Sequence, residues 1–206
     1  MAAAHILQCL LILPACILQC VGAEQTIRLD AEGRRWIRRI DGDTTARESA
    51  KFSRENKYIE LFSWIRKAKT VHIQSAFSAY DYKEGLAAAR LKIDNTHVCV
   101  VFPVTNFKAA IDTVWKRSMD KIVETPDNGV KYVMKTDSKM TDAERESFKS
   151  KSPVLYQTCQ GRRTTQIAII DETSAVTDED VSHLNHVTFM SIHGKVSFYL
   201  KSTLSV

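Results

Sequence analysis

Glycine and proline are scarce in this chain, with seven and four residues among 206. So little of either excludes a collagen-like or low-complexity protein, and no internal repeat is visible. Hydrophobic residues make up 44% of the sequence and charged residues 26%, which also excludes a generally disordered chain. The length suits one globular domain of ordinary size with flanking segments, or two small domains.

The motifs of common catalytic sites are missing as well. There is no nucleophile elbow, no glycine-rich phosphate loop and no paired-cysteine motif, so we predict a protein that is not an enzyme and has no cofactor. His183, His186 and His193 could suggest a metal site, but the first two lie three apart in a segment that need not be helical, and we predict no metal. The net charge of +5 is small for a nucleic-acid-binding protein, and no motif of such proteins accompanies it.

Charged residues are absent from the first 23 positions, and residues 6–21 are mostly apolar. Small residues at Val21, Gly22 and Ala23 predict cleavage of a signal peptide, residues 1–23, before Glu24, and hence a secreted protein. An uncleaved N-terminal membrane anchor is the alternative, although polar residues and a proline interrupt the apolar stretch.

Cysteine is rare once this leader is set aside. Three of the five cysteines lie in it, which leaves Cys99 and Cys159 in an oxidising compartment. We therefore predict one disulfide that closes a loop of about 60 residues and stabilises the fold by roughly 4 kcal/mol in the chain-entropy model.

Residues 24–69 are polar and rich in basic pairs, which predicts a linker or extended arm with a candidate short helix at 58–65. Arg35-Trp36-Ile37-Arg38 is a minimal processing pattern, although short basic runs are usually solvated surface. From there on, alternating or apolar runs predict strands at 71–82, 86–93, 97–102, 130–134 and 164–170.

Two helical segments interrupt these strands. The apolar positions from Phe107 to Ile122 form a stripe that predicts a helix over 105–123. A capping box at Thr141 and Glu144 predicts a second helix toward Cys159, which Pro153 should kink or restart. After an acidic connection, residues 187–200 alternate around a His193-Gly194 turn and predict a β-hairpin of high aggregation propensity.

The order of these elements resembles the BRICHOS domain over residues 70–170. The resemblance is carried by Tyr80-Asp81-Tyr82, by Cys99 in an apolar strand 18 positions after Asp81, by the amphipathic helix, and by Cys159-Gln160-Gly161 at the end of the second helix. Gastrokines are the most similar members, and the surfactant protein C precursor and Bri proteins share the outline.

This resemblance implies an α+β fold in which a five-stranded sheet is flanked by two helices and tied by a Cys99–Cys159 disulfide. It divides the chain into the leader, the linker at 24–69, a BRICHOS-like domain at 70–175 and a β-prone C-terminal segment at 176–206. It also implies an ATP-independent chaperone that binds β-prone or unfolded segments, its own C-terminal region included. Self-association into a homo-oligomer stays open. The candidate peptide-binding residues lie on the sheet and its covering helix: Tyr80, Tyr82, Val98, Val100, Phe107, Ile111 and Trp115.

Asp81 matches the family's functional carboxylate, and two roles are open for it. Among aromatic side chains, desolvation would raise its pKa and make it a pH sensor, so that Asp81→Asn would raise stability at neutral pH. Alternatively, Asp81 caps a turn by accepting hydrogen bonds from local amides, and the same variant would lower stability.

A precursor of a released C-terminal peptide is the alternative function. Some invertebrate BRICHOS proteins look like carriers of an antimicrobial hairpin, which binds anionic membranes through charge and apolar area. Residues 187–206 carry only Lys195 and Lys201 as strong cations, which disfavours a potent membrane-active peptide.

Overall fold

The computed structural model describes residues 27–30, 32–66, 72–93, 96–125, 129–134, 140–160, 166–170 and 185–200. The predicted signal peptide, the acidic connection and Gly161 lie outside these residues. The helices are α3 (Phe107–Trp115), α4 (Asp142–Lys151) and α5 (Pro153–Cys159). The strands are β1 (Arg34–Asp41), β2 (Thr44–Ser53), β3 (Tyr58–Arg66), β4 (Ala76–Asp81), β5 (Leu86–Ile93), β6 (Thr96–Pro103), β7 (Ile122–Glu124), β8 (Val130–Met134), β9 (Gln166–Ile169), β10 (Asn185–Met190) and β11 (Lys195–Leu200).

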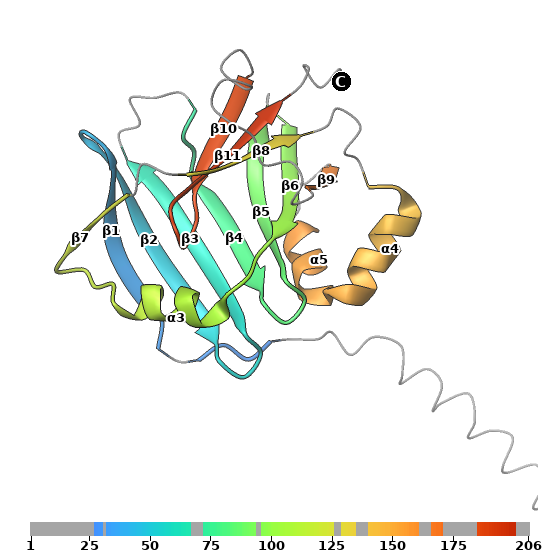
Figure 1. The fold of residues 1–206 in the computed structure, drawn as a ribbon, viewed down its shortest axis with the longest axis horizontal. Coiled ribbons are helices and arrows are strands. Elements are labelled where there is room, and N and C mark those ends of the chain that lie inside the picture. Colours follow the sequence, from blue (N-terminus) through green and yellow to red (C-terminus); the bar gives the residue numbers. More distant parts are fainter. Residues whose placement is uncertain are drawn as a thin grey trace, which may run out of the picture.

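An antiparallel meander from β1 to β6 forms most of a large sheet (Figure 1). Its order is β7-β1-β2-β3-β4-β5-β6-β9, and the two outer strands, β7 and β9, pair in parallel with their neighbours. The predicted α+β class is therefore confirmed, but the described sheet has eight strands where the resemblance implied five.

The prediction of a linker at 24–69 with a short helix at 58–65 is wrong for most of that range. Residues 34–66 form β1, β2 and β3. Trp36 and Ile40 in β1 and Ala46 and Phe52 in β2 are buried at alternate positions, a period of two that the basic residues between them obscured. Residues 58–65 carry apolar side chains at helical spacing, yet β3 bonds to a strand on each side, and this pairing overrides the local pattern.

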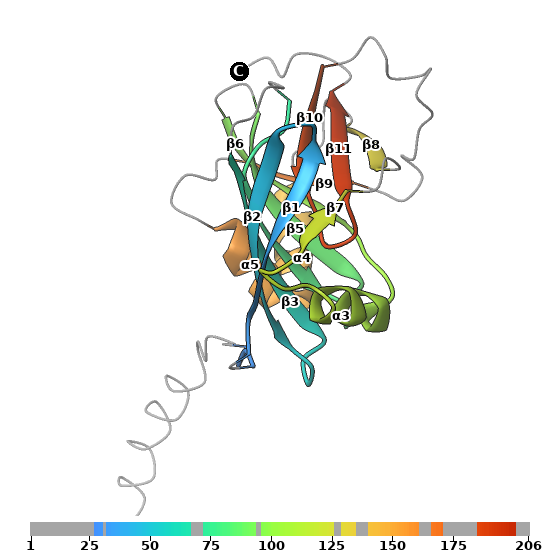
Figure 2. The same ribbon diagram turned by 90° about the vertical axis from the view of Figure 1, so that its left-hand side faces the viewer.

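A second sheet, of order β10-β11-β8, packs over one face of the large one (Figure 2). The predicted C-terminal hairpin is confirmed, since β10 and β11 pair antiparallel with Phe189 opposite Val196 and Val187 opposite Phe198. The strand predicted at 130–134 is also confirmed, but as β8 it pairs in parallel with β11. The C-terminal segment is thus part of the folded domain.

The outer edge of β10 also has a main-chain partner. The amide of Gln74 donates to the carbonyl of Thr188 at 3.0 Å, and the amide of Thr188 donates to the carbonyl of His72 at 2.7 Å. Residues 72–74, predicted as the start of the strand that becomes β4, therefore bond to the hairpin, and β4 begins at Ala76. The β11 edge of the hairpin is thus paired with β8, and the bridge at Thr188 covers part of the outer edge of β10.

The helices cover opposite faces of the large sheet. Helix α3 lies on the same side as the hairpin, whereas α4 and α5 lie on the other side, near β4, β5 and β9 (Figures 1 and 2). Helix α3 is shorter than the predicted 105–123: Asn106 caps it through a bond from the Ala109 amide, and by Ile122 the chain has become β7. The strand pairing of β7 with β1 takes these last residues out of the predicted helix.

The predicted start of the second helical segment is confirmed. The Thr141 hydroxyl accepts from the Glu144 amide, and the Glu144 carboxylate accepts from the Thr141 amide at 2.8 Å. The bonds that this carboxylate accepts from the Thr141 amide and, at 2.9 Å, from the Thr141 hydroxyl hold the pKa of the Glu144 carboxyl below its usual value. Pro153 at the first turn of α5 restarts the helix after Ser152.

The predicted disulfide is confirmed as well. Cys99 lies in β6, which pairs with the edge strand β9 of the large sheet, and Cys159 is the last residue of α5. Both are fully buried, with Ala79, Ala88 and Leu155 around them. The bond therefore ties the α4–α5 layer to the β6 side of the sheet.

Candidate functional site

The C-terminal hairpin packs on the large sheet through an aromatic cluster centred on Phe102 of β6. Its ring centroid lies 6.0 Å from those of Phe189 and Phe198, 6.4 Å from that of Tyr80 and 6.3 Å from that of Tyr132. Phe189 and Phe198 are fully buried, one from each strand of the hairpin. Aromatic pairs at such distances add to the area that they bury, so this cluster is the main apolar contact between the two sheets.

Six of the seven predicted peptide-binding residues lie in or against this cluster. Tyr80, Val98 and Val100 are buried in it, because alternate residues of β4 and β6 point to the hairpin side of the sheet. Tyr82, Phe107 and Ile111 pack against its margin, half-buried. The surface predicted to bind a β-prone peptide is therefore occupied, and its occupant is the chain's own hairpin.

Trp115, the seventh residue, does not join the cluster. It lies at the end of α3 with 42% of its surface exposed. Its ring meets Phe52 edge-on at 6.1 Å, and the Arg34 guanidinium lies 3.9 Å from the ring centroid on its face. Trp115 therefore covers the margin of the sheet at β1 and β2.

Two buried arginines, Arg38 of β1 and Arg117 after α3, hold the turn of the hairpin, and we call them the arginine clamp. Arg38 Nη2 donates to the carbonyl of Ser191 at 3.0 Å, and Arg117 Nη2 donates to the carbonyl of Ile192. Both acceptors are main-chain oxygens, so the clamp binds the backbone of the turn and not its side chains.

A carboxylate and a ring hold the clamp in place. Glu48 of β2 accepts from Arg38 Nε at 2.8 Å and also from Trp36 Nε1, and all three side chains are buried. The Arg117 guanidinium lies 4.7 Å from the centroid of the Trp36 ring. Glu48 therefore offsets the buried charge of Arg38, whereas among the described residues the Ile192 carbonyl and the Trp36 ring hold the charge of Arg117.

Arg117 of the clamp stays charged at neutral pH. Burial, and then the like charge of Arg38, lower the pKa of Arg117 to about 10, and Glu48 offsets part of this effect. Burial raises the pKa of Tyr80 to about 12, so its hydroxyl stays protonated and bonds to Ser78 Oγ at 3.0 Å.

Sequence reasoning missed the clamp completely. Arg38 was counted as one of the basic residues of a solvated linker, and Arg117 as part of a helix that ends before it. One signal could have revealed Arg38: Trp36, Arg38 and Ile40 alternate on one side of β1. In β2, Ala46 and Glu48 alternate on the same buried side, so that side carries one positive and one negative charge.

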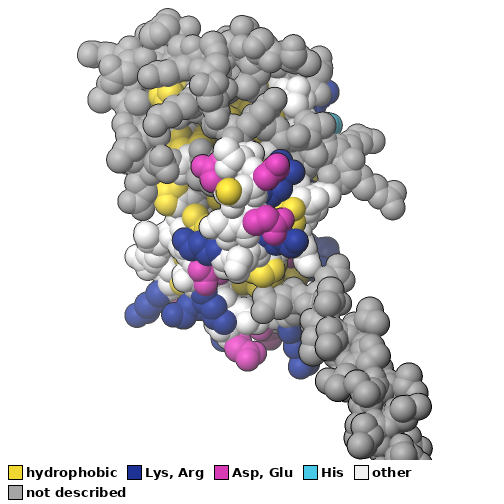
Figure 3. Space-filling view, turned by 90° about the vertical axis from the view of Figure 1, so that its right-hand side faces the viewer, with side chains coloured by type: hydrophobic (Ala, Val, Ile, Leu, Met, Phe, Trp, Pro, Cys, Tyr) yellow, Lys and Arg dark blue, Asp and Glu magenta, His cyan; other side chains and the backbone are white. Residues whose placement is uncertain are grey.

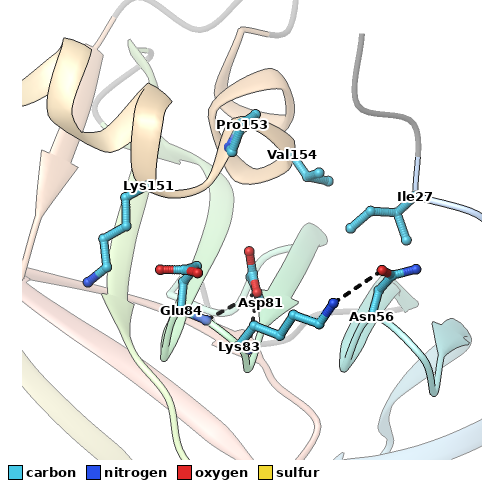
Figure 4. A pocket seen from close by; sticks show the side chains of 8 residues that line it. All are labelled: Ile27, Asn56, Asp81, Lys83, Glu84, Lys151, Pro153 and Val154. Atoms are coloured by element: carbon cyan, nitrogen blue, oxygen red, sulfur yellow. Dashed lines mark hydrogen bonds between the residues drawn. The ribbon is translucent and has the colours of Figure 1, made fainter. Parts of the chain in front are cut away.

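Asp81 lies at the end of β4 on the opposite face of the sheet from this cluster, in a cleft between the β4–β5 turn and the start of α5 (Figure 4). Its Oδ1 accepts from the amides of Lys83 at 3.2 Å and Glu84 at 3.3 Å. Its Oδ2 accepts from the hydroxyl of Ser152, between α4 and α5, at 2.7 Å. The turn-capping role is therefore confirmed, and the bond to Ser152 adds a second role, which is to join the turn to the helical layer.

Metal ligation finds no support in the described part of the chain, where no group of three or more His, Cys, Asp or Glu residues could hold an ion. His186 stacks between His72 and Tyr199, and His193 lies in the turn at the far end of β10, so the structure does not bring these two histidines together. His183 lies outside the described residues.

No family model, curated protein or solved structure matches this chain. None of the described helices is long and apolar enough to cross a membrane.

The first prediction concerns Asp81. Asp81→Ala removes the acceptor of three hydrogen bonds and should cost about 2 kcal/mol of unfolding free energy at pH 7. Asp81→Asn keeps an oxygen for the two amides and should cost about 1 kcal/mol. Urea unfolding measures both, and a double-mutant cycle with Ser152→Ala isolates the contact between the two side chains. An Asn variant more stable than the parent would contradict the capping role and favour the pH-sensing hypothesis.

The second prediction concerns pH. Partial desolvation, followed by the charges of Arg117 and Arg38, lowers the pKa of His193. The unfolded chain then binds the proton more readily, so this contribution to stability is complete above about pH 6.5, the pKa of an unfolded histidine, and is lost as pH falls below it. Unfolding midpoints measured from pH 7.5 to 5 should fall less steeply for His193→Gln than for the parent. Identical profiles would mean that the turn does not respond to this histidine.

Proposed function

We propose that the chain is a secreted BRICHOS-type protein that binds β-prone segments without ATP, its own C-terminal hairpin being the resident occupant. The order of β4, β5, β6, α3, β8, the α4–α5 layer and β9 supports this family assignment. So does the disulfide from β6, which has a strand on each side, to the end of the second helical segment. The charge-free leader and the disulfide support secretion.

The observation that carries the proposal is the way in which the hairpin is held. Apolar side chains of both its strands are buried in the cluster around Phe102, while the arginine clamp binds two main-chain carbonyls of its turn. Apolar contact and main-chain bonds depend little on sequence, which is how binding surfaces for extended peptides tolerate many partners. A face built in this way can accept other hairpins of similar pattern.

The hairpin itself has the character of a client. The two strands of the hairpin alternate in sequence, and their buried side carries Val187, Phe189, Val196 and Phe198. The segment has little charge to oppose the stacking of one copy on another. Such a segment forms cross-β aggregates when it is left exposed. Its burial in the same chain prevents this outcome.

Helix α3 is the candidate movable cover of the face. Of its nine residues only Ala110 and Val114 are fully buried, while Phe107 meets Tyr82 at a centroid distance of 5.4 Å. An element with so few buried side chains opens at a lower free-energy cost than the strands beneath it. Its displacement would expose Tyr82 and the margin of the cluster to a client.

The third prediction tests the proposal with a synthetic peptide of residues 185–206, whose fibril formation is followed by thioflavin fluorescence. Arg117→Gln removes a charge-assisted bond to the hairpin turn, at a cost of about 1.5–3 kcal/mol, which raises the population with a free face at least tenfold. The full-length variant should therefore delay fibril formation more than the parent at the same molar ratio. Lys116→Gln, at the exposed neighbouring position, is the matched control and should behave as the parent.

Two further results decide the outcome. Adding Phe107→Ser to Arg117→Gln removes an aromatic ring from the margin of the face and should reduce the delay. A peptide that stays soluble alone, or one whose fibrils form equally fast with every variant, would contradict the proposed function.

A further inference from the structure

The half of the large sheet formed by β1, β2 and β3 has one face that none of the described helices covers. Helices α4 and α5 lie near β4, β5 and β9, on the right of Figure 1, and do not extend over the left-hand strands on that side. Because side chains alternate, this open face carries the residues of β1 to β3 that do not point at the hairpin. Phe62 is 47% exposed on it and Trp64 55% exposed.

Basic side chains surround these two rings. Six exposed cations point to the open face, five from β1 to β3 and one from β5, on the far side of β4: Arg35, Arg39, Arg47, Lys51, Arg66 and Arg90. Glu60 is half-buried among them, and Glu124 of β7 pairs with Arg39 at 2.9 Å. The face is therefore strongly positive, although the whole chain carries a net charge of only +5.

Strand register sets these groups in rows across the sheet. One row runs through Arg35, Ser49, Phe62, Phe77 and Arg90, each directly opposite the next. With strands about 4.8 Å apart, its two arginines lie roughly 19 Å from each other, with two aromatic rings between them. Arg90 lies over Phe77, its Cζ 4.8 Å from the ring centroid.

A second row repeats the pattern, since Arg47 lies opposite Trp64. Where the face meets α5, a hollow is lined in part by Phe77, Arg90 and Gln157. Cations at intervals across several strands fit a linear polyanion, since a compact anion would meet only one or two of them. The rings between the cations offer apolar area to whatever lies along the row.

Two occupants fit this face poorly. A second copy docked face to face would bring equal basic rows together, and like charges across an interface oppose association. A bilayer would have to receive Phe62 and Trp64 from β3, an inner strand, and the charged Arg47 and Glu60 beside them would have to enter the apolar layer as well. The α4–α5 side is a contrast on the same molecule, since acidic and basic side chains alternate there (Figure 3).

We infer that the open face binds a linear sulfated or carboxylated polysaccharide. The Cys99–Cys159 disulfide belongs to an oxidising compartment, where such polysaccharides are the abundant linear polyanions. Arginine and lysine pair with the sulfate and carboxylate groups, and the C–H faces of the sugar rings pack on Phe62, Trp64 and Phe77. This inference shares with the proposed function the expectation of secretion, but it concerns the face of the sheet that the hairpin does not occupy.

The fourth prediction uses heparin as the probe and the full chain as the protein. The double variant Arg47→Gln/Arg90→Gln should weaken heparin binding about tenfold at physiological salt and lower the slope of log Kd against log salt by about two, one for each cation removed. Trp64→Ser should weaken binding without changing the slope, since the ring carries no charge. Lys116→Gln/Arg145→Gln removes the same charge from exposed positions on other surfaces and should bind as the parent.

The outcomes that overturn the inference are equally definite. They are a parent chain that does not bind heparin, a face variant that binds like the control variant, or tighter binding to a single-stranded oligonucleotide or to anionic phospholipid vesicles than to heparin. As a control, the unfolding midpoint of each variant is measured. A midpoint equal to that of the parent shows that the variant is folded and that its weaker binding is not due to unfolding.

Discussion

The structure depends on the burial of two hairpin phenylalanines, Phe189 and Phe198, against Phe102 of the large sheet. Without this contact the sheet would expose a broad apolar face and the hairpin would expose a β-prone segment, and each alone favours aggregation. Together they form one core, while β8 pairs along β11 and residues 72–74 bond to Thr188 of β10. The same contact therefore stabilises the domain and protects its β-prone hairpin from aggregation.

Charge divides the two faces of the sheet. On the hairpin face, Arg38 and Arg117 are buried and bind main-chain oxygens, which fixes the position of the turn where apolar contact alone would permit several. On the open face, arginines of the same strands are exposed between aromatic rings. Strand β1 shows this most simply, since Arg38 points inward while Arg35 and Arg39 point outward.

The features that local signals encode could be predicted from the sequence. These are the pairing of Cys99 with Cys159, the two cysteines outside the predicted leader, the capping box at Thr141 and the alternating hairpin. The missing features depend on pairing between distant segments: β1, β2 and β3 appeared polar because one of their faces is open, and Arg38 gave no sign of the buried Glu48 beside it. Asp81 is intermediate, since its turn was predictable, whereas its bond to Ser152, 71 residues away in sequence, was not.

Hydrogen exchange on the full chain tests the central claim, that the C-terminal hairpin is part of the folded core, most directly. Strand β11 lies between β10 and β8, so the amides of Val196 to Tyr199 that bond to these strands should exchange as slowly as those of β5 and β6. That corresponds to rates at least about a thousandfold below those of a random coil. Random-coil rates in β11 beside a protected β6 would show that the hairpin does not belong to the core and would contradict the account.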